Sequence, residues 1–91
     1  MGLINAWVYE YRGLAHYYNG DNEKAVEDFN FAIELDPLYA TSYWGRAQAY
    51  QKMGQLEAAL SDLQDFVALN PDHNNPSVFE TIAEIEAQLN R

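Results

Sequence analysis

The chain has 91 residues, no cysteine and a formal net charge of −9 at pH 7. This length is enough for one small domain, and the lack of cysteine excludes disulfides and thiolate metal sites. Its five Lys and Arg residues are scattered among fourteen acidic ones, which argues against a nucleic-acid partner and against an anionic membrane surface.

The first part of the chain predicts two helices joined by a glycine. The first helix is expected from Leu3 to Asn19 and ends at Gly20, because glycine readily takes the left-handed conformation that terminates helices. The second helix is expected to be capped by Asp21 or Asn22. It ends at an Asp-Pro pair, because proline cannot continue a helix and pushes the preceding residue out of helical geometry.

The remaining chain repeats this arrangement and adds one more helix. A third helix is expected over residues 39–53, ending at Gly54, and a fourth over residues 56–69, again closed by a proline. The fifth, residues 76–89, is expected to start with Asn75 as its cap and a proline at its first helical position. The pattern therefore predicts two helix pairs and a final single helix.

Both helix pairs follow one 34-residue period. Ten residues between positions 6 and 37 recur 34 positions later, where chance would give roughly two or three. In the first unit they are Ala6, Tyr9, Arg12, Ala15, Gly20, Glu23, Ala25, Asp28, Leu35 and Pro37. A fixed period in this range indicates stacked helical units rather than one closed core.

With its period, central glycine and closing proline, the chain resembles the tetratricopeptide repeat family. In the first unit, residues 6–39, the signature positions are Tyr9, Gly13, Gly20, Ala25, Phe29, Ala32 and Pro37. In the second unit, residues 40–73, they are Tyr43, Ala47, Gly54, Ala59, Leu63 and Pro71. The resemblance implies an all-α fold of antiparallel helix-turn-helix repeats. These would stack as a short right-handed superhelix of five helices, a single domain over residues 1–91 with a capping helix at 76–89.

Several side chains are assigned to packing. Gly13 and Ala47 are small where the two helices of a unit should cross, and Phe29 and Leu63 should fill the core beside them. Phe66 replaces a small residue of the first unit, which predicts a wider or tilted junction with the last helix.

The last helix is expected to be amphipathic and to resemble a further first helix of a unit, displaced by two residues. Its predicted apolar stripe consists of Val78, Ile82, Ile85 and Leu89, widened by Phe79 and Ala83.

Two ion pairs are expected to brace the units. Arg12 precedes Asp28 by sixteen residues, and Arg46 precedes Asp62 by the same distance, so each pair joins the two helices of one unit. We interpret these four residues as structural rather than as ligand-binding. His16 lies on a mostly apolar helix face and is expected to be packed and hydrogen-bonded.

A partner-binding surface is implied by the resemblance, since the first helix of each unit lines the concave face where partner peptides usually lie. The equivalent positions are Trp7, Glu10, Leu14, Tyr17, Thr41, Trp44, Gln48 and Gln51. The first helix is apolar nearly all round and should not face water on either side. Trp7, Tyr17 and Trp44 would form a groove for a peptide or helix, be buried by self-association, or be covered by a preceding repeat.

Two details narrow the type of partner. Family members that clamp a C-terminal carboxylate use Lys and Asn at inner-face positions, where this chain has Glu10, Leu14 and Gly45, so that activity is not expected. The net charge of −9 would instead steer in a ligand carrying Lys or Arg. Gly45 either opens a shallow pocket beside Trp44 or is merely tolerated in its helix.

No catalytic, cofactor or metal site is predicted. His16 and His73 are the only histidines and match no nucleophile–base spacing, and no glycine-rich phosphate loop is present. We therefore expect a non-enzymatic protein-interaction module, with a self-associating structural segment, or a piece of a longer array, as the alternative. Because the chain shows neither a signal peptide nor a membrane span, a cytoplasmic location is expected.

Overall fold

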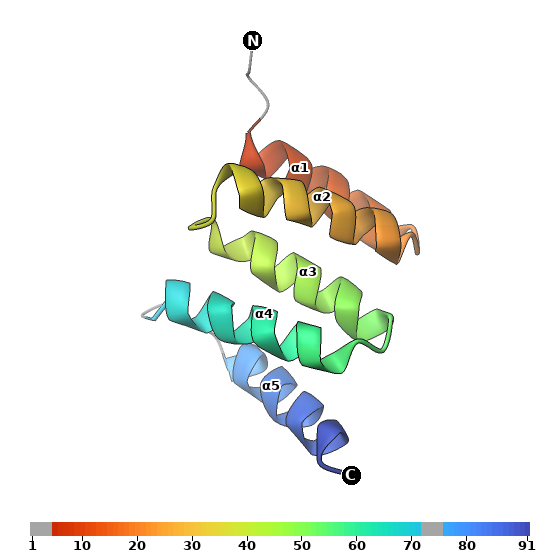
Figure 1. Ribbon diagram of the computed structural model, residues 1–91, viewed down its shortest axis with the longest axis vertical. Helices are drawn as coiled ribbons and strands as arrows, with labels where there is room; N and C mark the ends of the chain where they lie inside the picture. The colour runs from red at the N-terminus through yellow and green to blue at the C-terminus, as the bar shows by residue number, and fades with distance from the viewer. Residues whose placement is uncertain (1–4, 72–75) are drawn as a thin grey trace.

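Five α-helices occupy most of the described chain, residues 5–71 and 76–91, of this computed structural model (Figure 1). They are α1 (Ala6–Tyr18), α2 (Asn22–Leu35), α3 (Ala40–Lys52), α4 (Leu56–Leu69) and α5 (Pro76–Leu89). The all-α prediction is confirmed. Gly20 and Gly54 follow α1 and α3 with φ of +85° and +77°, the left-handed conformation that was predicted to end these helices.

Two helix starts differ from the prediction. Asn5 is extended, with φ −129° and ψ −179°, so α1 begins at Ala6 and not at the predicted Leu3. Leu3 and Asn75, the predicted cap of the last helix, lie outside the described residues. Tyr39 is also non-helical and α3 begins one residue later. In the turn between α2 and α3, an Asp36 carboxylate oxygen accepts a hydrogen bond from a backbone N–H two residues on, at 3.1 Å.

The helices stack in chain order along the long axis of the molecule (Figure 1). Each packs against its neighbours in the sequence, and α1 also lies against α3, so these two first helices share one side of the stack. The extents of 48 × 31 × 17 Å are those of an elongated repeat array rather than a sphere.

The core is divided among the junctions between helices. Its buried side chains form three clusters: Ala25, Phe29 and Ala49; Ala47, Ala59, Leu63 and Ile85; and Ala40, Phe66 and Val78. Each cluster takes residues from at least two helices, and α3 contributes to all three. Every helix therefore depends on its neighbours to bury its apolar face.

Phe29 of α2 is completely buried between two glycines. A Cβ on Gly13 of α1 would lie 3.0 Å from the Phe29 ring, and one on Gly45 of α3 would lie 2.5 Å from it. The second distance is shorter than real Cβ contacts, so the close approach of α2 and α3 requires a glycine here. Gly45 is therefore not merely tolerated.

The junction with α5 is wider than the junction between the first two units. Cα atoms of α1 and α3 approach within 8 Å, whereas those of α3 and α5 do not. Phe66 fills the space, packing with Trp44 on one side and Val78 on the other. This is the consequence expected when a large side chain replaces the small Ala32 of the first unit.

On α5 the predicted stripe is too broad. Val78 and Ile85 are fully buried and Ile82 is partly buried, but Phe79 is 51% exposed and Ala83 is also exposed. The reason is geometric, because α5 packs on α4 through one face only among the described helices. The two residues that were thought to widen the stripe lie beyond that face.

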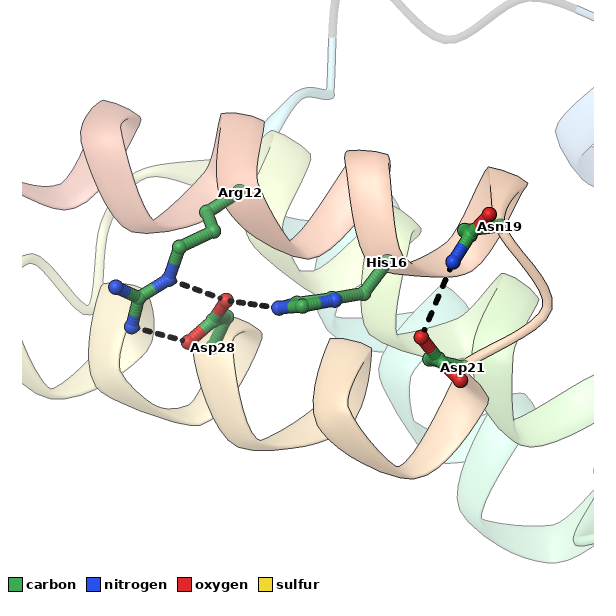
Figure 2. Close-up of polar contacts among 5 residues, drawn as sticks. All are labelled: Arg12, His16, Asn19, Asp21 and Asp28. Atoms are coloured by element: carbon green, nitrogen blue, oxygen red, sulfur yellow. Dashed lines mark hydrogen bonds and ion pairs between the residues drawn. The ribbon is translucent and has the colours of Figure 1, made fainter.

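A bidentate ion pair joins the helices of each unit. In the first, Arg12 donates from Nε and Nη2 to the two carboxylate oxygens of Asp28, both at 2.8 Å (Figure 2). In the second, Arg46 donates to Asp62 at 2.8 and 2.7 Å. In both pairs the hydrogen bond to the aspartate raises the pKa of the arginine above its usual value.

The surroundings of the two pairs differ. Arg46 is 20% exposed and donates a further bond to Asn30 Oδ1 at 2.7 Å, whereas Arg12 is 60% exposed. His16 extends the first pair, with its Nε2 3.6 Å from Asp28 Oδ2 (Figure 2). That distance is too long for the hydrogen bond expected of His16.

Candidate partner-binding groove

The eight residues predicted to face a partner all line hollows along α1 and α3. The central hollow, about 510 Å³, is lined by Glu10, Tyr11, Leu14, Tyr39, Thr41, Trp44, Gly45, Gln48 and Phe66. One neighbour, about 360 Å³, lies at Trp7 and shares Tyr39 with it. Another, about 240 Å³, is lined by Tyr17, Gln48, Gln51 and Lys52 and shares Gln48. We call these three adjoining hollows the α1–α3 groove.

A buried carboxylate lies in the central hollow. Glu10 is only 6% exposed, and its Oε1 accepts a hydrogen bond of 2.9 Å from the Tyr39 hydroxyl. Burial and the bond to Glu10 both raise the pKa of Tyr39, so the phenol stays protonated and acts as the donor. None of the residues that line this hollow is basic.

Aromatic rings form much of the wall. Trp44 packs edge-on against Phe66, with ring centroids 4.9 Å apart and an interplanar angle of 76°. Trp7 and Tyr11 make a second edge-on pair at 5.6 Å. Because its ring is held by a buried phenylalanine, Trp44 offers a partner a preorganised apolar contact.

The far end of the groove is more polar. Tyr17 packs on Tyr18 at 5.1 Å, and burial raises its pKa. Gln48, Gln51 and Lys52 complete this hollow. Amide groups that face an open hollow can donate and accept hydrogen bonds, so this end suits the backbone of an extended or helical peptide.

Sequence reasoning missed three residues that line the central hollow. Tyr39 and Phe66 were read only as a helix start and as a packing departure, and Tyr11 was not considered. A usable signal existed for Tyr39, because an aromatic residue directly after a proline turn and before a helix is placed at the junction of two units.

Several aromatic rings of α1 are exposed to solvent, two of them in the lining of the groove. Trp7 is 50% exposed, Tyr11 62% and Tyr18 77%. The expectation that this helix should not face water on either side is therefore not met in the isolated chain.

Another depression, about 530 Å³, lies between the Gly20–Lys24 turn and the residues Met53 and Gln55. Its lining comes from successive turns and is mostly polar, without an aromatic ring. We read it as the space between two repeat turns.

Across residues 5–71 and 76–91, no three His, Cys, Asp or Glu residues are grouped so that they could hold a metal ion. None of the helices in these ranges is both long and apolar enough to cross a membrane.

Comparison with known families and relatives gives a consistent result. A family model described as "TPR repeat" matches residues 13–54, and one described as "Tetratricopeptide repeat" matches residues 40–73. Superkiller protein 3 of Saccharomyces cerevisiae is 29% identical over 79 residues, which are 87% of this chain and 6% of the relative. Tetratricopeptide repeat protein 36 homolog of Nematostella vectensis is 35% identical over 65 residues, 71% of this chain and 36% of the relative. The chain thus spans much less than two thirds of either relative.

Among solved structures, the second TPR domain of the human RPAP3 protein, determined by NMR in complex with the HSP70 peptide SGPTIEEVD, is similar to this chain. The TM-score is 0.81 at 27% sequence identity, covering 90% of this chain and 67% of the other. The similarity therefore extends over most of this chain.

Proposed function

We propose that the α1–α3 groove of this chain binds a peptide or helix of a partner protein. The chain belongs to the tetratricopeptide repeat family. Members of this family are generally non-enzymatic protein-interaction modules, and the chain carries that fold. The observation that carries the proposal is the alignment of all eight predicted residues along one row of adjoining hollows with a preorganised Trp44 at its centre.

The structural neighbour supports a peptide ligand but not the same peptide. The HSP70 peptide in that complex contains two glutamates and an aspartate. In this chain the central hollow contains the buried Glu10 and no basic side chain. Like charges at such short range are unfavourable, so an acidic peptide is not the ligand that this groove suits.

A display selection tests the proposal. Random dodecapeptides selected on the wild-type chain are measured against Gln48→Arg, which puts a long charged side chain in the groove. The matched control is Gln64→Arg, the same change at an exposed position of α4 that lines no groove hollow. We expect Gln48→Arg to weaken binding by about tenfold or more and Gln64→Arg to leave it unchanged. Equal affinity for both variants would contradict the proposal.

A second candidate, self-association, is favoured by the exposed aromatic rings of α1, above all Tyr18, which lines none of the groove hollows. Sedimentation velocity over a wide concentration range distinguishes the two. A dimer that Tyr18→Arg dissociates would support the alternative. A monomer at every concentration would exclude it and leave the groove as the functional surface.

A further inference from the structure

We propose that the α1–α3 groove recognises one Lys or Arg side chain of its partner, which places its cation against the Glu10 carboxylate and the aromatic rings around it. This inference rests on the proposed function and names the chemistry of the ligand at one position.

Glu10 is buried like two other acidic residues of the chain but, unlike them, is not paired with an arginine within the described residues. Glu10, Asp28 and Asp62 are 6%, 4% and 3% exposed, so all three acidic residues are buried to a similar degree. Asp28 and Asp62 are each matched by an arginine that donates two bonds. Among residues 5–71 and 76–91, Glu10 has no ion pair, and the Tyr39 hydroxyl is a neutral donor to one of its oxygens.

Burying a carboxylate without an opposite charge is unfavourable, because the interior replaces its hydration poorly. A cation from a partner would supply the missing charge where the groove is open. Glu10 lines the central hollow, so a side chain entering from solvent can reach it. The buried carboxylate is thus prepared for a cationic ligand.

The wall of the central hollow around Glu10 is largely aromatic and apolar. Tyr11, Tyr39 and Trp44 line the same hollow, and aromatic faces attract ammonium and guanidinium groups. Leu14 adds an apolar surface for the methylene stem of a long side chain. A neutral apolar side chain would fill this space but would leave the carboxylate uncompensated.

In the second unit, the residue equivalent to Glu10 is Trp44. There the position is occupied by a ring that packs on Phe66 at 4.9 Å, and no carboxylate is available. Within the central hollow, Glu10 of α1 is therefore the one charged residue of the lining, which gives the bound peptide a fixed register. The net charge of −9 adds attraction at long range but not this register.

The experiment uses dodecapeptides selected on the wild-type chain and a double-mutant cycle. In the tightest peptide, the Lys is replaced by norleucine or the Arg by citrulline, and each peptide is titrated against wild type, Glu10→Gln and Glu80→Gln. Glutamine keeps an oxygen that can accept the Tyr39 hydrogen bond, and Glu80→Gln is the same change at an exposed position of α5.

Removing the peptide cation should weaken binding to wild type and to Glu80→Gln by about tenfold or more, and to Glu10→Gln by about threefold or less. Peptides that lose binding on Gln48→Arg but show no basic preference, or an equal loss on Glu10→Gln, would overturn the inference and leave the proposed function standing. If no selected peptide responds to Gln48→Arg, both fail.

A measurement on the wild-type chain keeps the test decisive if Glu10→Gln does not fold. The indole N–H resonance of Trp44 is followed by NMR with the Lys peptide and with its norleucine counterpart. A larger shift of this resonance with the Lys peptide at matched saturation is expected. Equal shifts would contradict a cation beside Glu10.

Discussion

The two repeat units contain the same arginine–aspartate pair in different surroundings. Arg46 is one-fifth exposed and is held by Asp62 and by Asn30 of the preceding unit, whereas Arg12 is 60% exposed. Identical residues at identical spacing are thus expected to differ in their contribution to stability, because Arg46 also bonds to the preceding unit and is less exposed than Arg12. In a repeat protein, position in the array decides the energetic importance of a shared residue.

Residues that differ between the two units line the groove instead of joining the helices of a unit. Where the first unit has Glu10 and Ala32, the second has Trp44 and Phe66, and Glu10, Trp44 and Phe66 all line the central hollow of the groove. Shared residues hold the units together, and unshared residues give the groove its chemistry. The predictions below test both halves of this comparison.

The largest effect is expected from Asp62→Asn. It removes the negative charge that Arg46 faces in a mostly buried site, so the free energy of unfolding should fall by about 3 kcal/mol. Asp28→Asn should cost less, because the exposed Arg12 regains water. Urea unfolding followed by circular dichroism measures both, and an equal or larger loss for Asp28→Asn would contradict the comparison.

A smaller effect is expected from Gly45→Ala. Its Cβ would lie 2.5 Å from the ring of the fully buried Phe29, and this overlap should outweigh the better helix propensity of alanine. The net loss should be about 1–2 kcal/mol. Gly13→Ala, where the contact would be 3.0 Å, serves as the matched variant and should lose less stability by thermal or urea unfolding. A stabilising Gly45→Ala would show that α2 and α3 do not approach so closely.

The smallest effect is a gain. Ser42 is fully buried and its hydroxyl has no hydrogen-bond partner within the described chain, whereas the equivalent residue of the first unit is the apolar Val8. Ser42→Ala should therefore raise the free energy of unfolding by up to about 1 kcal/mol. A loss of stability in the same urea experiment would indicate that the hydroxyl is satisfied.

Much of the scaffold follows from the sequence. Glycines and prolines mark where the first four helices stop, and the 34-residue period identifies the small and large residues at the crossings. The sixteen-residue spacing identifies both arginine–aspartate pairs, and the same spacing, read backward from Arg46, reaches Asn30. These features are local or repeat with the chain, so the pattern contains them.

The details of the groove and of the helix packing are harder to predict from the sequence pattern. The burial of Glu10 depends on the Tyr39 hydroxyl, 29 residues away in a turn whose conformation the pattern predicted as helical. The need for Gly45 depends on the position of Phe29 in another helix. The exposure of Phe79 depends on which helices pack on α5. Each is a property of the assembled stack, and the sequence pattern of one helix does not contain it.

The central claim is that the residues in which the units differ form the binding surface. Titration of the isotope-labelled chain with a selected peptide, followed by NMR, tests it most directly. The account predicts shifts concentrated at Glu10, Trp44 and Gln48, with the exposed residues Glu27 of α2 and Gln64 of α4 unaffected. Shifts concentrated on α2 and α4 instead would contradict it.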